Sequence, residues 1–197
     1  SSFSGYGNTA FCTDGVDDYL SIPDDNNDFD FGTGAFTVDF WMYRETIDQH
    51  AAIHRHGASG ADSSSWGIYG TTTLTISDGT TAFASAANTL KTGWQHISWN
   101  RSGTNDEKIY IDGILQGTNT RATDYASSEP IRIGHFWGGS YEKVWYDEFR
   151  INKAQYLPPR FYLGNQTPES GEVLTAFKYA TLNGTSQYYH KAVDDWQ

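Results

Sequence analysis

The 197-residue chain has one cysteine, one methionine and five prolines, and only 19% of its residues are charged. Because Cys12 has no second cysteine to pair with, an intramolecular disulfide is excluded and the core alone must hold the fold. No apolar run reaches the length of a membrane span, and no secretory signal pattern is present. The sequence starts Ser1-Ser2-Phe3 without an initiator methionine, as expected of a processed product or a fragment of a longer protein.

Positive charge is also scarce. Thirteen lysines and arginines stand against 24 aspartates and glutamates, so the formal net charge is −11 and the pI is about 4.7. Such a surface repels phosphate backbones and anionic lipids, which argues against nucleic acid and membrane insertion. Many acids lie close together, as Asp24, Asp25, Asp28 and Asp30 do. Aspartates favour turns and solubility, and cation binding by a few of them is the alternative.

Aromatic residues, by contrast, are abundant, with seven Trp and thirteen Tyr. They favour pleated, half-buried strands, whereas helices favour Leu, Ala, Glu and Lys. Twenty glycines indicate many turns. No segment has a sustained helical period of apolar residues with caps. The composition predicts an all-β protein, and the length suits one β-sandwich or barrel.

Residues 35–43, AFTVDFWMY, alternate with a period of two, as expected of a strand with one buried face. The two faces are Phe36, Val38, Phe40 and Met42 on one side, and Thr37, Asp39, Trp41 and Tyr43 on the other. Further strands are predicted over residues 19–22, 66–69, 74–76, 81–84, 94–100, 108–111, 114–116, 131–134 and 144–151. Asp112-Gly113 between two apolar runs predicts a tight hairpin. Many short strands with such turns favour an antiparallel sandwich.

The pattern of short alternating strands ends after Ile151. We assign residues 1–163 to one domain and 164–171, GNQTPESG, to a surface linker. Residues 172–197 are interpreted as the opening strands of a truncated second repeat, because 180–189 is similar in pattern to 10–20; a coincidental hairpin is the alternative. Two opening strands cannot bury their own face, so this tail must pack in cis or on a neighbouring chain.

Five blocks of sequence occur in one order along residues 10–157. They are FCTDGVDDYLSIPD, FGTGAFTVDFWMY, GWQHISWNRSG, KIYIDGILQGT and YDEFRI. Together they resemble a laminin G-like domain of the concanavalin A-like lectin/glucanase superfamily. The final block, which is followed by a Tyr and a Pro pair, is similar to forms found in bacteriophage and other viral structural proteins.

This resemblance implies a two-sheet antiparallel jelly-roll sandwich. It also implies binding of carbohydrate or protein at a cell or virion surface, sometimes with calcium. Trp94, His96, Arg101 and Gly103 match the family pattern in their block. His96 is interpreted as a structural histidine rather than a catalytic one.

Catalysis is not expected. Retaining glycosidases need two carboxyl groups about 5 Å apart, and laminarinase-like relatives place theirs on one strand as Glu-x-Asp-x-Glu or Glu-x-Asp-x-x-Glu. No such run is present, and the adjacent Asp147 and Glu148 project to opposite faces of a strand. Neither a serine nucleophile elbow nor a phosphate-binding glycine loop is found.

A sugar site needs an exposed aromatic platform flanked by polar groups. The candidates lie near loops rich in Ser or Gly: Trp66, Tyr69, Trp137 and Tyr141. The alternative is that most of these rings cover the core or an interface.

Calcium is the candidate cofactor. The resemblance implies a structural calcium between the last strand and an early turn, for which Asp147 and Asp14 are the candidate side-chain ligands. The alternative for Asp147 is that it caps backbone N–H groups. His50, His54 and His56 are close in sequence, but zinc needs three or four well-placed ligands, and a surface strand end is the preferred interpretation.

The sequence therefore predicts a non-catalytic surface module that binds carbohydrate, on a virion, with a secreted or cell-surface location as the alternative. Its partners are predicted to be glycans, surface proteins or other structural subunits. A structural decoration or assembly protein that uses the sandwich for protein contacts is the second hypothesis.

Overall fold

Strands are the regular elements of the computed structural model of this chain, which describes residues 10–24, 26–47, 50–55, 65–136, 140–153, 177–182 and 185–190. No helix occurs in these ranges, and none is therefore long and apolar enough to cross a membrane. The chain divides into two units, Ser1–Pro158 and Pro159–Gln197. The predicted linker at 164–171 lies outside the described residues.

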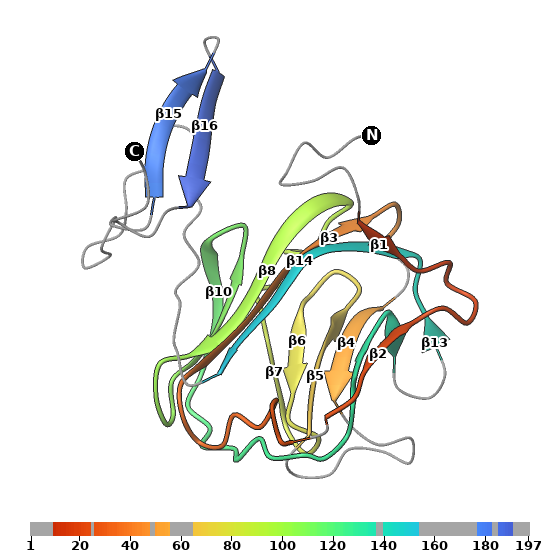
Figure 1. Cartoon of the computed structure of the whole chain (residues 1–197), viewed down its shortest axis with the longest axis vertical. Helices are drawn as coiled ribbons and strands as arrows, with labels where there is room; N and C mark the ends of the chain where they lie inside the picture. The colour runs from red at the N-terminus through yellow and green to blue at the C-terminus, as the bar shows by residue number, and fades with distance from the viewer. Residues whose placement is uncertain are drawn as a thin grey trace. The chain divides into compact units, whose positions relative to one another are not determined.

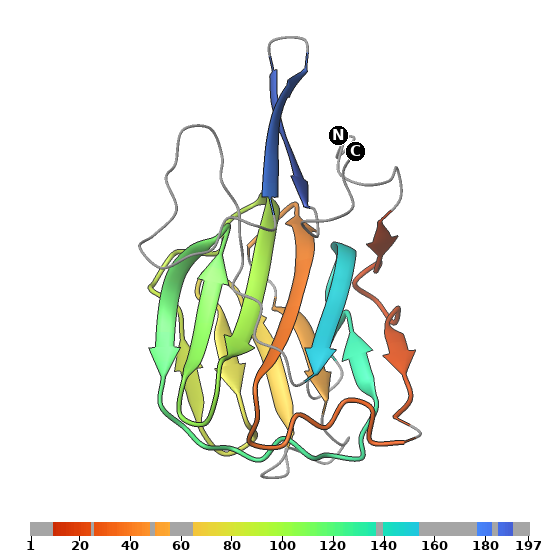
Figure 2. The same ribbon diagram turned by 60° about the vertical axis from the view of Figure 1, so that its left-hand side comes forward.

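The first unit contains two six-stranded antiparallel sheets that face each other (Figure 1). Sheet A has the order β1-β14-β3-β8-β9-β10. Its strands are β1 (Phe11–Cys12), β14 (Val144–Lys153), β3 (Phe36–Arg44), β8 (Gly93–Arg101), β9 (Glu107–Ile111) and β10 (Ile114–Asn119). Figure 2 looks onto the outer face of this sheet, with β8, β3 and β14 side by side in its centre.

Sheet B has the order β2-β11-β4-β5-β6-β7. Its strands are β2 (Leu20–Ile22), β11 (Ile131–Ile133), β4 (Ala51–Arg55), β5 (Trp66–Gly70), β6 (Thr75–Ser77) and β7 (Ala82–Ala84). A separate two-stranded ribbon, β12 (His135–Phe136) with β13 (Ser140–Tyr141), follows β11. The predicted two-sheet antiparallel sandwich is thus confirmed.

The core between the sheets comes from the alternation read in the sequence. On β3, Phe36, Val38, Phe40 and Met42 are all buried. Trp99 of β8 packs edge-on against Phe36, with ring centroids 4.5 Å apart. Rings from different strands and loops interlock here, which stabilises the fold through apolar burial and aromatic geometry.

A buried polar network closes one end of this core around Glu107. Tyr125 Oη donates to Glu107 Oε1 at 2.9 Å, and Arg121 Nε donates to Oε2 at 3.0 Å. Burial raises the pKa of Glu107, while Arg121, Tyr125 and Arg101 favour its charged form. The Arg101 guanidinium donates hydrogen bonds to backbone carbonyls, including Gly34 O at 2.7 Å. The buried Glu107 charge is tolerated because both of its carboxylate oxygens accept hydrogen bonds and two arginines lie beside it.

The hairpin predicted at Asp112-Gly113 joins β9 to β10. Asp112 has φ 53° and Gly113 has φ 77°, the left-handed pair that a two-residue turn of type I′ requires. Asp112 also fixes the neighbouring strand, since its Oδ1 accepts the His96 N–H at 2.8 Å.

The second unit is described through one antiparallel pair, β15 (Phe177–Leu182) with β16 (Thr185–His190). Leu182 pairs with Thr185 at one end of this pair. The interpretation of residues 172–197 as the opening strands of a second repeat stays a prediction.

Candidate functional site

The outer face of sheet A carries a ladder of side chains in four rows across β8, β3 and β14. The strand registers define these rows, because residues opposite one another on neighbouring strands point to the same side of the sheet. We call this set the outer ladder. Its rows are Trp94, Tyr43 and Trp145; His96, Trp41 and Asp147; Ser98, Asp39 and Arg150; Asn100, Thr37 and Asn152.

The first row is entirely aromatic. The Tyr43 ring lies 5.5 Å from that of Trp94 and 5.3 Å from that of Trp145. All three residues are half-buried, so each keeps part of its ring surface open to solvent. A contiguous, partly exposed aromatic surface of this kind offers a platform for an apolar ligand face.

The rows of the ladder become more polar with distance from the aromatic row. In the second row Trp41 packs edge-on against His96, with centroids 5.3 Å apart. In the third, Arg150 Nε and Nη2 donate to Asp39 Oδ2 at 3.1 and 2.9 Å. His96 Nε2 lies 3.6 Å from the other oxygen of Asp39. Asp39 therefore lies between the second and third rows and accepts two hydrogen bonds from Arg150.

A bulge in β14 sits beside the second and third rows. The pairing with β3 shifts between Asp147 and Arg150, and Glu148 within the bulge has φ 49°. Burial raises the pKa of Glu148, and the neighbouring Asp147 carboxylate raises it further. The prediction that Asp147 and Glu148 project to opposite faces is therefore corrected. The bulge breaks the alternation, and ladder charges such as Arg150 act on Glu148 as well, so both acids lie at the rim of the ladder.

The structure describes three of the four residues predicted to bind sugar, and it separates Trp66 from Tyr69 and Tyr141. Trp66 is fully buried in the core and stacks on Phe31, so it offers no exposed ring face. Its predicted role as a platform is therefore corrected: the inward parity of β5 puts it among core residues. Trp137 lies outside the described residues.

Tyr69 and Tyr141 are both half-buried and both contact β12. Tyr69 packs against Phe136 with centroids 5.1 Å apart, and Tyr141 against His135 at the same distance. The two predicted residues thus contact neighbouring residues, Phe136 and His135, of the short strand β12.

The histidines predicted as weak zinc candidates do not gather. His54 is buried on β4 and its Nε2 lies 2.8 Å from His135 Nδ1. His50 instead stacks on Phe136 at 4.7 Å, and His56 lies outside the described residues. Over the described ranges, no cluster of three possible metal ligands contains a histidine.

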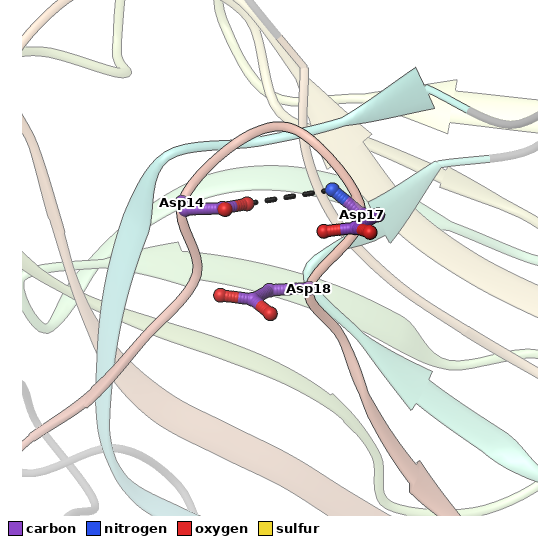
Figure 3. Close-up of side chains that lie close together, drawn as sticks. All are labelled: Asp14, Asp17 and Asp18. Carbon is purple, nitrogen blue, oxygen red and sulfur yellow. Dashed lines mark hydrogen bonds between the residues drawn. The ribbon is translucent and has the colours of Figure 1, made fainter.

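Asp14 belongs to an acidic turn between β1 and β2 (Figure 3). Its Oδ1 accepts the Val16 N–H at 2.7 Å, and this bond lowers the pKa of Asp14. Carboxylate oxygens of Asp14, Asp17 and Asp18 lie within 4.8 Å of one another, and all three residues are exposed. Carboxylates in such a turn are the donors that calcium prefers.

The second predicted calcium ligand lies elsewhere. Cys12 pairs with Trp145 on β14, so the register continues from Asp14 to Lys143. Asp147 is four residues further along, about 13 Å at the usual rise of a strand. Its Oδ1 accepts the N–H of Glu148 at 2.8 Å, which is the backbone-capping role that the sequence left as the alternative.

Sequence reasoning missed the outer ladder as a site, although a signal was present. The alternation over 35–43 sets Trp41 and Tyr43 on the face opposite the core. Large aromatics on the solvent side of a strand need a reason. Their partners Trp94 and Trp145 come from strands far away in sequence, and only the register brings the three together.

Comparison with known proteins identifies the fold independently. A laminin G family model, described as the concanavalin A-like lectin/glucanases superfamily, matches residues 14–155. No curated protein sequence matches the chain.

Several solved structures are similar to this one. Domain 4 of an extracellular arabinanase from Geobacillus stearothermophilus, solved in complex with arabinotriose, has a TM-score of 0.53 and 17% identity over 79% of this chain and 80% of that chain. The binding domain of botulinum neurotoxin serotype D has a TM-score of 0.57 and 15% identity, over 78% and 40%. Domains LG4–5 of the mouse laminin alpha1 chain have 0.52 and 12%, over 73% and 40%. At these identities the likeness shows the fold.

Proposed function

Because the chain belongs to the concanavalin A-like lectin/glucanases superfamily, we propose that it is a non-catalytic module that binds carbohydrate on the outer ladder. One observation carries this proposal: three half-buried aromatic rings form one row that continues directly into polar rows. A sugar ring has apolar faces and a hydroxyl rim, and the ladder offers a complement to both. The similar neurotoxin structure is a binding domain by its description, and the arabinanase domain was solved in complex with arabinotriose, which supports a binding role.

The acids of the ladder support binding rather than hydrolysis. Asp39 already accepts two hydrogen bonds from Arg150, and Asp147 caps the N–H of Glu148. A glycosidase needs one free acid and one free carboxylate on either side of the bond. Neither aspartate is available as a general acid or a nucleophile, so this face is suited to binding a sugar rather than cleaving it.

Tyr69 and Tyr141 define a second candidate face, on the outside of sheet B and along β12. It is the site that the sequence favoured, and it differs from the outer ladder in having histidines rather than carboxylates beside its rings. Calcium at the turn of Asp14, Asp17 and Asp18 stays a prediction, with Asp147 too far along β14 to share it.

Protein contact is the alternative function. Ile114 and Leu115 at the β9–β10 hairpin are 55% and 43% exposed, and such apolar residues at an edge strand favour subunit contacts. The virion location rests on the resemblance of the YDEFRI block alone. Co-purification of the protein with virus particles, rather than as a free monomer, would support both the protein-contact function and the virion location.

A glycan array probed with the full chain tests the proposed function. We expect saturable binding to a defined class of glycan, without release of reducing ends on incubation. Trp94→Ala should weaken that binding about tenfold or more, because it removes one ring of the platform. Tyr69→Ala is the matched control, a half-buried aromatic on the other sheet, and should leave binding unchanged. A blank array with a folded sample, or loss of binding in Tyr69→Ala alone, contradicts the assignment to the outer ladder.

A further inference from the structure

The charges of the outer ladder indicate which sugars it takes. We propose that the site selects uncharged oligosaccharides and discriminates against glycans that carry carboxylate or sulfate groups. This inference rests on the proposed function and adds the chemical class of its ligand.

In the part of the chain that the structure describes, Arg150 of the ladder and Lys143 beside it are already paired with acids. Arg150 donates twice to Asp39. Lys143 lies over the Trp145 ring at 5.3 Å, but its Nζ donates to Glu45 Oε2 at 3.0 Å. An anionic sugar would have to take one of these cations from its carboxylate, so the pairs provide little net attraction for it.

The acids that are not paired with a base lie where an anionic group would be repelled. Asp147 belongs to the second row and Glu148 to the bulge beside it. Successive rows are two residues apart along a strand, about 7 Å. This spacing puts Asp147 within the Debye length of about 8 Å at physiological ionic strength, whereas Glu148 is about 10 Å from the first row. A carboxylate or sulfate on a sugar stacked over the first row is therefore repelled mainly by Asp147 and less strongly by Glu148.

The order of the rows also sets the direction of the ligand. The aromatic row and the row of Asp39 are four residues apart on β3, about 13 Å along the strand. A ligand that uses both must extend along β3, which suits an oligosaccharide of several units better than one sugar. Thr37, Ser98 and Asn100 are fully buried and Asp39 and His96 nearly so. In the second and third rows, the accessible residues of the ladder are therefore Trp41, Asp147 and Arg150.

Matched glycan pairs provide the direct test. Tetrasaccharides of β-1,4-linked mannose and mannuronate differ only in the group at C6, as do those of glucose and glucuronate with the same linkage. Titration of the full chain with each pair, together with the glycan array, should show binding to at least one uncharged probe and at least tenfold weaker binding to its anionic match.

A pair of charge variants tests the cause. Asp147→Asn combined with Glu148→Gln should strengthen binding of the anionic probe about tenfold, since it removes two charges, about 7 and 10 Å from the first row. Asp28→Asn combined with Asp124→Asn changes the net charge by the same amount at two exposed positions. This control should leave the ratio of the two affinities unchanged, because both residues lie near Phe36, at the end of β3 away from the aromatic row.

The outcomes separate this inference from the function on which it rests. If the anionic probe binds more tightly than its uncharged match and Trp94→Ala abolishes that binding, the proposed ligand class is wrong but the carbohydrate site stands. An equal change in both double variants shows that net charge, rather than the ladder, selects the ligand, and so overturns the proposed cause. Binding of none of the probes and no glycan on the array overturns both.

Discussion

The inner and outer faces of sheet A are built from the same strands and both contain tryptophans, yet they have different physical roles. Trp99 on the inner face of β8 is completely buried and donates its indole N–H to Glu107 Oε2 at 3.4 Å. Trp94, five residues earlier on the same strand, is half-buried beside Tyr43. The odd separation in sequence puts the two rings on opposite sides of the sheet.

This difference shows that the residue type does not decide the role of an aromatic side chain in a sandwich. Parity within the strand decides whether a ring stabilises the core or faces outward. Cross-strand register then decides whether outward rings are isolated or form a platform. The predictions below test each side of the comparison.

The largest effect is expected on the inner face. Trp99→Ala should lower the free energy of unfolding by about 3–5 kcal/mol, because it leaves a cavity among Phe36, Phe31 and Tyr125. Denaturant unfolding followed by circular dichroism measures this loss. A change below about 1 kcal/mol would contradict the central place of Trp99 in the core.

A buried carboxylate in the β6–β7 turn should have the next largest effect. Burial alone would raise the pKa of Asp78, but hydrogen bonds from Thr123, Thr81 and Thr80, together with Arg121, lower it to about 2. The folded state thus favours the carboxylate, so this stabilisation is present above the ordinary pKa near 4 and is lost as pH falls towards 2.

We therefore expect Asp78→Asn to cost about 2 kcal/mol at pH 7 and progressively less between pH 4 and pH 2. Chemical denaturation across this pH range measures the difference. Asp17→Asn, at an exposed position, is the control and should change the free energy of unfolding by about 0.5 kcal/mol or less. A cost for Asp78→Asn that is independent of pH would contradict the proposed role of the charge.

On the outer face, Trp94→Ala should change stability by about 1 kcal/mol or less, because the ring is only half-buried. Its effect on glycan affinity should be the larger one. Comparing its unfolding midpoint with that of Trp99→Ala sharpens the contrast between the two faces. Equal destabilisation by both variants would show that the outer rings serve the fold.

The smallest expected effect is electrostatic. Asp147→Asn removes the neighbouring charge that raises the pKa of Glu148, so that pKa should fall towards its ordinary value. Carbon-detected NMR titration of the Glu148 carboxyl group measures the shift. An unchanged pKa would leave burial as the whole cause.

Much of the fold was predictable because alternation and turn chemistry are local. The strand over 35–43 and the hairpin at Asp112-Gly113 follow from neighbouring residues alone, and the structure confirms both. The short strands β1 and β12 were missed, because two-residue segments have too few alternations to detect. The site was harder to predict: Trp66 sits in a short strand whose inward face the sequence did not reveal.

The sequence by itself determined the all-β class, the strand alternation, the acidic surface and the family resemblance, since each is a property of composition or of nearby residues. Only the tertiary structure decided that Trp94, Tyr43 and Trp145 form one row, that Asp39 pairs with Arg150, and that Asp14 and Asp147 lie apart. The reason is physical: these relations depend on the register between strands distant in sequence, and a shift of one residue would move every side chain to the opposite face.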